Sequence, residues 1–384
     1  MLALLRNEKV RGILYQFLVI AGFILVAYFI AKNTAHNIEI RGIKSGFGFL
    51  HSTAGFDITE SPIPFTPQST HWDVFKVGLL NTLIVSFAGI ILSSILGLII
   101  GVSRLSKNWI INRLAAGYVE TFRNIPVLLQ ILFWYNVVLA TLPATRQSLN
   151  FFNSIFINNR GIFVPKPIFG PGAWLIGAAL IAALLAGWWL HRYAIKLHEA
   201  TGKNFPAFWI SLGLVIGLPL LAYFISGRPV TFDYPALKGF NFQGGKVFTP
   251  EFLALLFALS IYTATFIAEA IRSGIEAVPK GQKEAATALG LSPLQSLRFV
   301  VLPQAVRIAI PSVINQYLNL TKNSSLAAAI GYPELVTIFA GTSLNQTGQA
   351  LEILGITMLT YLLISLVVSL ILNWFNAKMK IKER

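Results

Sequence analysis

Cysteine is absent from the 384-residue chain, and histidine is rare. The lack of cysteine excludes thiol catalysis, disulfide bonds and cysteine metal sites. The five histidines are scattered along the chain, and none has the spacing of metal ligands: His36, His51, His71, His191 and His198. We therefore expect loop or interfacial histidines and no metal site.

Charge is also scarce, since 12% of the residues are charged, against about 25% in globular domains. The mean hydropathy is +0.67, and several continuous apolar runs reach the length of about 18 residues that can cross a bilayer as helix. A β-barrel would need short alternating strands, which such runs do not resemble. The composition predicts an all-α polytopic membrane protein.

The charges that are present are mostly basic, and the formal net charge is +15. Because Lys and Arg flank the apolar runs, we expect an anionic lipid surface as their partner and no nucleic acid. The chain also contains no GxxxxGK[ST] motif, so no P-loop for ATP is encoded in it.

The apolar runs predict eight membrane spans. They cover residues 12–31, 77–103, 114–141, 172–190, 207–226, 251–273, 304–330 and 352–376. The first run, about 19 residues long, exceeds the usual apolar core of a signal peptide, which favours an uncleaved anchor over a cleaved signal. Gly97/Gly101 and Gly213/Gly217 form GxxxG pairs, which are compatible with close helix packing but do not establish it.

Lys and Arg are more frequent on the side of the N-terminus, which predicts that both termini are cytoplasmic. The predicted inner residues are Arg6, Lys9, Arg11, Arg104, Lys107, Arg113, Arg192, Lys196, Lys203, Arg272, Lys280, Lys283, Arg298, Lys378, Lys380, Lys382 and Arg384. The predicted outer residues are Lys32, Arg41, Lys44, Lys76, Arg146, Arg160, Lys166, Arg228, Lys238 and Lys246.

Three long loops would then face outward, at residues 32–76, 142–171 and 227–250. The first contains "SPIPFTPQST", which we expect to be non-helical. Such loops can cap a pore, dock an external partner or simply connect spans.

The connection between the sixth and seventh predicted spans is polar and regular. "GQKEAATALG" (residues 281–290) is rich in helix formers, and Gly290 suits the left-handed position that ends a helix. Ser292 then suits an N-cap, Pro293 the first helical position and Gln295 a capping box. The pattern predicts a helix, a sharp turn and a second helix that ends near residues 302–303.

The first helix of this connection is short and has a small, smooth alanine surface. Helices that lie on lipid headgroups carry bulky apolar residues on one face, whereas this helix has a single leucine. The composition favours packing into a groove of another protein over an interfacial position.

The spacing from Glu284-Ala285-Ala286 through Gly290 to "VVLP" (residues 300–303) resembles the EAA loop of ABC importer permeases. "AEAIRSGIEAVPKGQKEAA" and "LPQAVRIAIPSVINQYLNLTKNSSLA", together with residues 78–106 and 118–135, resemble the polar amino acid permease subfamily. The first span and the two-span insertion resemble the larger permease subunit of general L-amino acid importers. The predicted domains are residues 1–76 (span and outward loop), 77–142 (first core part), 143–250 (insertion) and 251–384 (second core part with coupling loop 281–303).

This resemblance implies a permease core of the type I ABC importer fold in the bacterial inner membrane, with no cofactor on this chain. ATP and Mg would lie on a cytoplasmic ATPase dimer, which the coupling loop contacts, and a periplasmic amino acid-binding protein would deliver the substrate. One coupling helix per chain implies a second permease subunit, identical or, as in general L-amino acid importers, a different related chain. The coupling residues would be Gly281, Glu284, Ala285, Ala286, Gly290 and Pro303.

Polar groups within spans are costly and usually functional, so they are candidates for the substrate path. They are Glu120, Glu269, Asn315, Asn319, Lys322, Asn323 and Ser324. Glu120 with Arg123 and Glu269 with Arg272 have the spacing of structural salt bridges instead. Asn315, Asn319 and Lys322 share a helix face that either lines the path or forms hydrogen bonds between helices.

The sequence is compatible with two transport mechanisms. In the importer, ATP binding on the partner would draw the coupling helices together and rock the permeases between outward-open and inward-open states. The alternative is an ion-coupled secondary amino acid transporter, which typically has internal repeats. No repeat is evident, and the coupling loop would have no purpose in such a protein.

Overall fold

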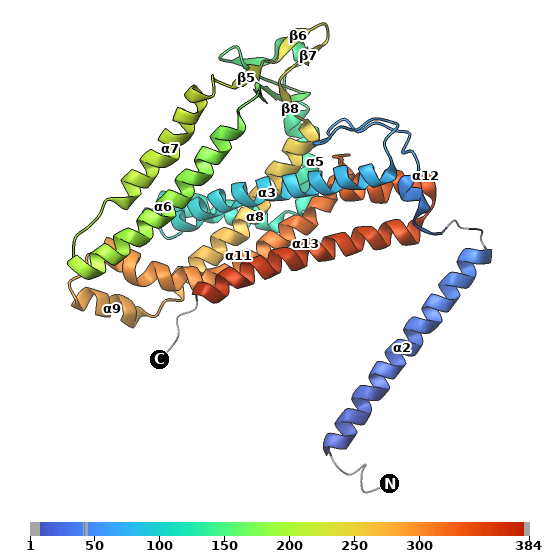
Figure 1. Ribbon diagram of the computed structural model, residues 1–384. Coiled ribbons are helices and arrows are strands. Elements are labelled where there is room, and N and C mark those ends of the chain that lie inside the picture. Colours follow the sequence, from blue (N-terminus) through green and yellow to red (C-terminus); the bar gives the residue numbers. More distant parts are fainter. Residues whose placement is uncertain (1–7, 41, 43–44, 380–384) are drawn as a thin grey trace. The chain divides into compact units, whose positions relative to one another are not determined.

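A computed structural model describes residues 8–40, 42 and 45–379 and is predominantly helical (Figure 1). The chain forms two compact units, one of residues 1–134 and 254–384 and the other of residues 135–253. Arg6, Arg41, Lys44, Lys380, Lys382 and Arg384, which contribute to the predicted sidedness, lie outside the described residues.

The first unit contains most of the long helices. Its α-helices are α2 (Glu8–Ile40), α3 (His71–Ser103), α4 (Trp109–Asn124), α5 (Val127–Phe133), α9 (Lys280–Ala288), α10 (Pro293–Ser296), α11 (Leu302–Asn323), α12 (Leu344–Thr347) and α13 (Ala350–Met379). Helix α8 (Pro250–Glu276) begins in the second unit and continues into the first. Its short 3₁₀ or π segments are η1 (Phe47–His51), η4 (Leu297–Val301), η5 (Ser324–Ala329) and η6 (Val336–Ser343), while η2 (Trp134–Leu139) begins at its boundary and lies mostly in the second unit.

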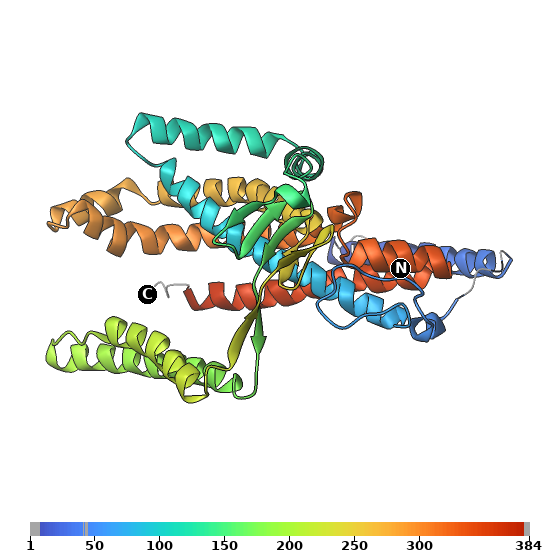
Figure 2. The ribbon, with the colours of Figure 1, turned by 90° about the horizontal axis from the view of Figure 1, so that it is seen from above.

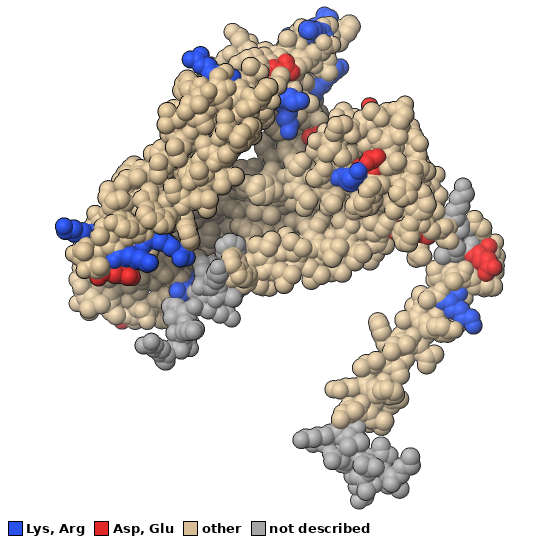
Figure 3. All heavy atoms as spheres, viewed as in Figure 1, with Lys and Arg blue, Asp and Glu red and all other residues tan. Residues whose placement is uncertain are grey.

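Among the described residues, seven helices are long and apolar enough to span a membrane, and a bent pair would make an eighth. Most of the surface visible in Figure 3 is uncharged, as a bilayer requires. Helix α3 begins at His71 rather than at residue 77, because Thr70 and Asp73 form a capping box that fixes its start. The preceding "SPIPFTPQST" segment is non-helical, as predicted.

The third predicted span, residues 114–141, is wrong as a continuous helix. It divides into α4 and a second segment, Val127–Leu139, which are bent by 100° relative to each other. Pro126 lacks an N–H and disfavours helical geometry at the residue before it, so Ile125 is extended (φ −92°, ψ 127°). The side-chain amide of Gln130 donates to the carbonyl oxygens of Phe122 and Ile125, at 2.8 and 3.0 Å. These bonds replace the helical hydrogen bonds that are lost where α4 ends.

The prediction that a helix ends near residues 302–303 is also wrong. Helix α10 continues through η4 into α11, and the candidate span covers Pro293–Ala329, 37 residues. The π-type segment η4 immediately precedes Pro303, and the Leu302 N–H bonds the Leu297 carbonyl five residues back. This widened turn accommodates the proline near the start of α11, so the helix continues without a stop.

One of the two GxxxG pairs is a packing seam. A Cβ added to Gly97 would lie 2.6 Å from Ile267 Cγ2, and one added to Gly101 would lie 2.9 Å from the Ala268 carbonyl oxygen. Helices α3 and α8 therefore approach as closely as glycine allows. A Cβ added to Gly213 would meet no atom within 4 Å, and the same holds at Gly217.

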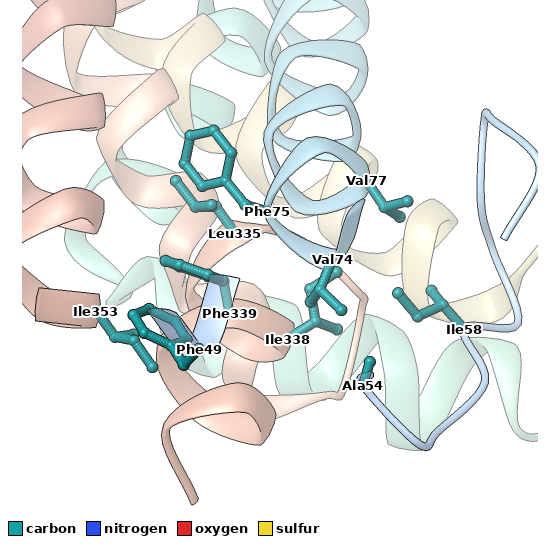
Figure 4. Close-up of a cluster of buried hydrophobic side chains, with 10 residues drawn as sticks. All are labelled: Phe49, Ala54, Ile58, Val74, Phe75, Val77, Leu335, Ile338, Phe339 and Ile353. Atoms are coloured by element: carbon teal, nitrogen blue, oxygen red, sulfur yellow. The ribbon is translucent and has the colours of Figure 1, made fainter. Parts of the chain in front are cut away.

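A hydrophobic cluster holds the 47–58 loop, α3, η6 and α13 together (Figure 4). The ring of Phe339 lies 5.3 Å from that of Phe75, edge-on, and 6.3 Å from that of Phe49. The other buried members are Ala54, Ile58, Val74, Val77, Leu335, Ile338 and Ile353. This cluster fixes the loop after the first span against the long helices.

The second unit combines a helical hairpin with small antiparallel sheets, which the sequence analysis did not predict. Helices α6 (Trp174–Thr201) and α7 (Ala207–Ile225) lie side by side (Figure 1, Figure 2). The strands are β1 (Leu149–Phe151), β2 (Ile155–Asn158), β3 (Gly161–Val164), β4 (Lys166–Phe169), β5 (Val230–Asp233), β6 (Ala236–Lys238), β7 (Asn241–Gln243) and β8 (Lys246–Phe248).

Two of the predicted outward loops are joined by strand pairing. β3 of the 142–171 loop pairs with β8 of the 227–250 loop, and β4 pairs with β5 directly before α6 and after α7. Sequence periodicity is weak in strands of three or four residues, and pairing between segments this far apart leaves no local signal.

We expect Gly97→Ala to lower the stability of the first unit by about 1–3 kcal/mol, because the new methyl group overlaps Ile267. The apparent melting temperature of the full chain in detergent measures this loss. Gly213→Ala is the matched control, since it also places a methyl group on a helix but meets no neighbour. Equal melting temperatures for the two variants would contradict the close approach of α3 and α8.

Candidate functional site

The connection between α9 and α10 forms a rigid corner, residues 289–293. Gly290 has φ +75°, and its N–H donates to the Thr287 carbonyl while the Leu291 N–H donates to that of Ala286. This pair of bonds is a Schellman motif, which closes α9. The predicted left-handed position of Gly290 is confirmed.

The second side of the corner is fixed by an N-terminal cap. Ser292 Oγ accepts from the Gln295 N–H, and Gln295 Oε1 accepts from the Ser292 N–H, with Pro293 at the start of α10. The predicted capping box is confirmed. Both sides of the turn are thus held by local hydrogen bonds, which makes the corner stiff without support from another chain.

Nearly the whole surface of α9 is open to solvent. Gly281, Glu284 and Ala285 are exposed, and the Leu289 side chain beside the corner is 81% exposed. Ala286 is the exception, because α9 packs on η4 and buries it. Ala286 therefore faces η4, and Ala285 is the small residue of the predicted pair that is exposed on α9. Pro303, also predicted for this site, is exposed on α11.

Helix α11 presents a row of polar side chains at its C-terminal half. Asn315, Asn319 and Lys322 are exposed and form no side-chain hydrogen bond within the described chain. The opposite face packs against α3 and α13 and buries Ile314 and Leu320. The structure therefore brings the three predicted residues together on one unpacked face.

Lys322 lines a cavity of about 460 Å³ between α11, η6 and α13. The other polar lining residues are Ser325, Thr357, Tyr361 and Ser365, and the apolar ones are Val336, Met358 and Leu362. Within the described chain, no carboxylate forms a salt bridge with Lys322. An unpaired ammonium group beside hydroxyl groups can bind a carboxylate.

The remaining predicted path residues lie elsewhere. Asn323 is half-buried next to Lys322, whereas Ser324 is buried and donates to the Thr321 carbonyl at 2.6 Å. Glu120 is exposed on α4, and the predicted pairing of Glu120 with Arg123 is wrong for the described chain. The Arg123 guanidinium instead lies 5.4 Å from the ring centroid of Phe266.

Glu269 belongs to a network of four charges. It pairs with Arg272, as predicted, and also with Arg104 from the end of α3, while Arg272 pairs with Glu276. The two carboxylates and two guanidinium groups compensate one another, so this cluster ties α3 to α8 rather than offering a free charge.

Glu334 is a buried carboxyl group that is not among the residues predicted from the sequence. One oxygen accepts from the N–H and hydroxyl of Thr337, and the other from the Val336 N–H and from Tyr361 Oη. Glu334 therefore fixes Tyr361, which lines the cavity. Burial raises the pKa of the Glu334 carboxyl, although the hydrogen bonds act in the opposite direction. Its signal in the sequence is a single acid in an apolar stretch between two spans.

The raised pKa of Glu334 gives stability a defined pH dependence. The folded chain binds a proton to this group at pH values where the unfolded chain has lost it, so stability falls as pH rises above about 4.5 through the raised pKa. We expect the melting temperature of the Glu334→Gln variant to change less over this range than that of the wild type. Glu39→Gln, at an exposed site on α2, should keep the wild-type profile, and identical profiles for all three proteins would contradict the burial effect.

The chain is similar over nearly its whole length to curated transport proteins. It is 51% identical to a general L-amino acid transport system permease protein of Rhizobium johnstonii, covering 98% of this chain and 94% of that protein. It is 48% identical to a putative amino-acid ABC transporter permease protein of Escherichia coli, covering 98% and 96% of the two chains. A glutamate/glutamine/aspartate/asparagine transport system permease protein of Rhodobacter capsulatus is 40% identical, over 99% and 96%.

Residues 176–381 match a protein family, and this segment makes up more than half of the chain. The match includes α8, the α9–α10 corner, the polar face of α11 and the cavity beside Lys322. The multiple apolar spans agree with it, and the secondary-transporter alternative loses its support. The chain belongs to the family of inner membrane components of binding-protein-dependent transport systems.

Proposed function

We propose that this chain is the permease subunit of an ATP-driven importer that moves amino acids from the periplasm to the cytoplasm. The observation that carries the proposal is the exposed helix α9, which ends in a stiff corner and continues into the helix that bears Lys322. The names of the relatives supply the substrate class, since all three describe amino acid transport.

Helix α9 is the contact to a cytoplasmic ATPase. Its exposed Glu284, Ala285 and Leu289 provide a charge, a small residue and an apolar anchor, a combination suited to a cleft on another protein. ATP and Mg bind to that partner, because this chain has no P-loop. With one such helix per chain, an ATPase dimer requires a second permease, and we favour a different but related chain.

The helix from Pro293 onward transmits the motion of the corner. Lys322 lies about 44 Å along its axis from Pro293, at 1.5 Å per residue. Helix α9 is braced against the same helix by the burial of Ala286 on η4 and by a hydrogen bond from Gln304 Nε2 to Gln282 Oε1 at 3.4 Å. Movement of α9 by the ATPase therefore shifts the polar face of α11 in the same step.

The cavity beside Lys322 is our candidate for the substrate carboxylate. An amino acid is a zwitterion, and an unpaired charge close to the bilayer is costly unless a ligand compensates it. Lys322 supplies the positive charge, and Asn315 and Asn319 continue the polar face along α11. Alternating access follows if rocking of the two permeases opens this face first outward, to a periplasmic binding protein, and then inward.

The excess of Lys and Arg on one side orients the chain with both termini in the cytoplasm. In this orientation, the α9–α10 corner faces the ATPase, and the strands of the second unit face the periplasm. Residues 46–70 of the first unit belong to a predicted outward loop, and they supply part of the hydrophobic cluster.

Glu284→Lys combined with Gly290→Pro should uncouple ATP hydrolysis from transport. The first change reverses the charge on the exposed face of α9, and the second is incompatible with φ +75°, so it breaks the corner. ATP-driven amino acid uptake by the reconstituted transporter should be lost while the membrane fold is retained. Glu199→Lys, at an exposed site in the second unit, is the control. Normal amino acid uptake by the double variant would refute the role of α9 and its corner in coupling.

Lys322→Met should weaken substrate recognition. Loss of a charge-assisted hydrogen bond costs about 1.5–3 kcal/mol, which is roughly 10- to 100-fold in apparent affinity. The measurement is the amino acid concentration that gives half-maximal uptake in proteoliposomes. Lys107→Met, at an exposed lysine between α3 and α4, should leave that concentration unchanged. An unchanged half-maximal concentration for Lys322→Met would contradict a contact between Lys322 and the substrate.

A further inference from the structure

The α6/α7 hairpin packs almost entirely on itself. In the most apolar 18-residue stretch of each helix, 6% of the α6 residues and none of the α7 residues are buried. The contact between the two helices is close, because a Cβ added to Gly187 would lie 3.2 Å from the Cβ of Ser211. Most of the hairpin surface is therefore available to lipid or to a partner.

The register of the hairpin follows from two contacts. Gly187 lies opposite Ser211, and the rings of Tyr193 and Phe205 meet at 5.7 Å in a T-shaped arrangement. In an antiparallel pair, each step forward on one helix is a step back on the other. Both contacts therefore place residue 189 opposite residue 209, near the end of the hairpin.

Four large aromatic residues lie at this level of the hairpin: Trp188, Trp189, Phe208 and Trp209. Each is between 56% and 70% exposed, so none is part of a core. Trp side chains are enriched at the boundary between hydrocarbon and headgroups. Along the axis of α6, Trp188 and Trp189 lie about 21–22 Å from Trp174 at the opposite end, and a hydrocarbon core of about 30 Å would end near residue 194. We refer to these four exposed residues as the aromatic belt.

Basic side chains follow the belt directly. Arg192, Lys196 and Lys203 are exposed, and no salt bridge engages them within the described part of the chain. Glu199 is the one acidic residue of the sequence between positions 170 and 232. The guanidinium of Arg192 lies 4.3 Å from the ring centroid of Trp188, which orients it at the level of the belt.

We propose that this end of the hairpin binds the headgroup phosphate of an anionic phospholipid. Arg192, Lys196 and Lys203 supply the positive charges, and the belt holds the glycerol and upper acyl region of the lipid. In the orientation proposed above, the site lies in the cytoplasmic leaflet. Lipid fits better than a protein partner, because cations that directly follow an interfacial belt lie where headgroup phosphates lie.

Lipid retention by the purified full-length chain in a non-ionic detergent tests the proposal. Phosphatidylglycerol and phosphatidylcholine are added at equal amounts, and bound lipids are counted by native mass spectrometry. The wild type should retain phosphatidylglycerol preferentially. Arg192→Gln/Lys196→Gln/Lys203→Gln should weaken this retention about a hundredfold, at about fivefold per removed cation.

The matched control removes three exposed cations from the strands and turns of the same unit, as Arg160→Gln/Lys166→Gln/Lys238→Gln. It should retain phosphatidylglycerol like the wild type. Equal losses in the two triple variants would overturn the proposal, as would equal retention of the two lipids by the wild type. Unchanged lipid retention with lost binding to another subunit would assign the patch to a protein interface instead.

The Trp188→Leu variant tests whether the aromatic belt contributes to lipid binding or whether the three positive charges alone account for it. It keeps all three cations but removes the ring under Arg192, and we expect a loss of about two- to fivefold in phosphatidylglycerol retention. The helix content measured by circular dichroism should be unchanged, because Trp188 is exposed. Retention equal to that of the wild type would overturn the role of the belt.

Discussion

The continuity of the helix from Pro293 to Ala329 is the constraint on which the rest of the first unit depends. Prolines at positions 293, 303 and 311 would be expected to divide such a segment. Pro293 instead starts the helix, and the π-type turn of η4 precedes Pro303, so the axis continues. The α9–α10 corner and the cavity beside Lys322 are therefore joined by one continuous helix.

Helix α8 packs closely against both α3 and the helix that begins at Pro293. It approaches α3 at Gly97 and Gly101, and it approaches α11 at Gly274, where a Cβ would lie 2.7 Å from the Ala305 carbonyl oxygen. At Gly101 and Gly274 the nearest atoms are backbone carbonyl oxygens, so no flexible side chain lies between the helices there and little room is left for sliding. The charge network around Glu269 adds a tie between the ends of α3 and α8. We expect α3, α8 and α11 to move as a group rather than separately.

Features encoded by neighbouring residues were predictable from the sequence. The corner is an example, since Gly290, Ser292 and Gln295 each act within three or four residues of their partners. The membrane spans were also predictable, because a helix that crosses a bilayer is recognised by the length and apolar composition of its sequence alone. The break before Pro126 also has a local cause in the sequence. It was not predicted because it lies within a long apolar run.

Features that depend on tertiary contacts were not predictable. The burial of Ala286 requires the packing of α9 on η4, and the cavity beside Lys322 requires residues of α13 such as Tyr361. Strand pairing between β3 and β8 bridges segments separated by both hairpin helices. Glu334 belongs to the same class, because its environment is set by Thr337 and by Tyr361 on another helix.

The pairing of β4 with β5 has a consequence for how this chain could have been assembled in evolution. These strands join the residues that enter α6 to those that leave α7, so the hairpin is closed at its base. A segment whose entry and exit are adjacent can be gained or lost without moving the elements on either side. Its contacts are also close in sequence, which favours rapid and autonomous folding. We expect that a permease without this hairpin would need only a short turn between β4 and β5.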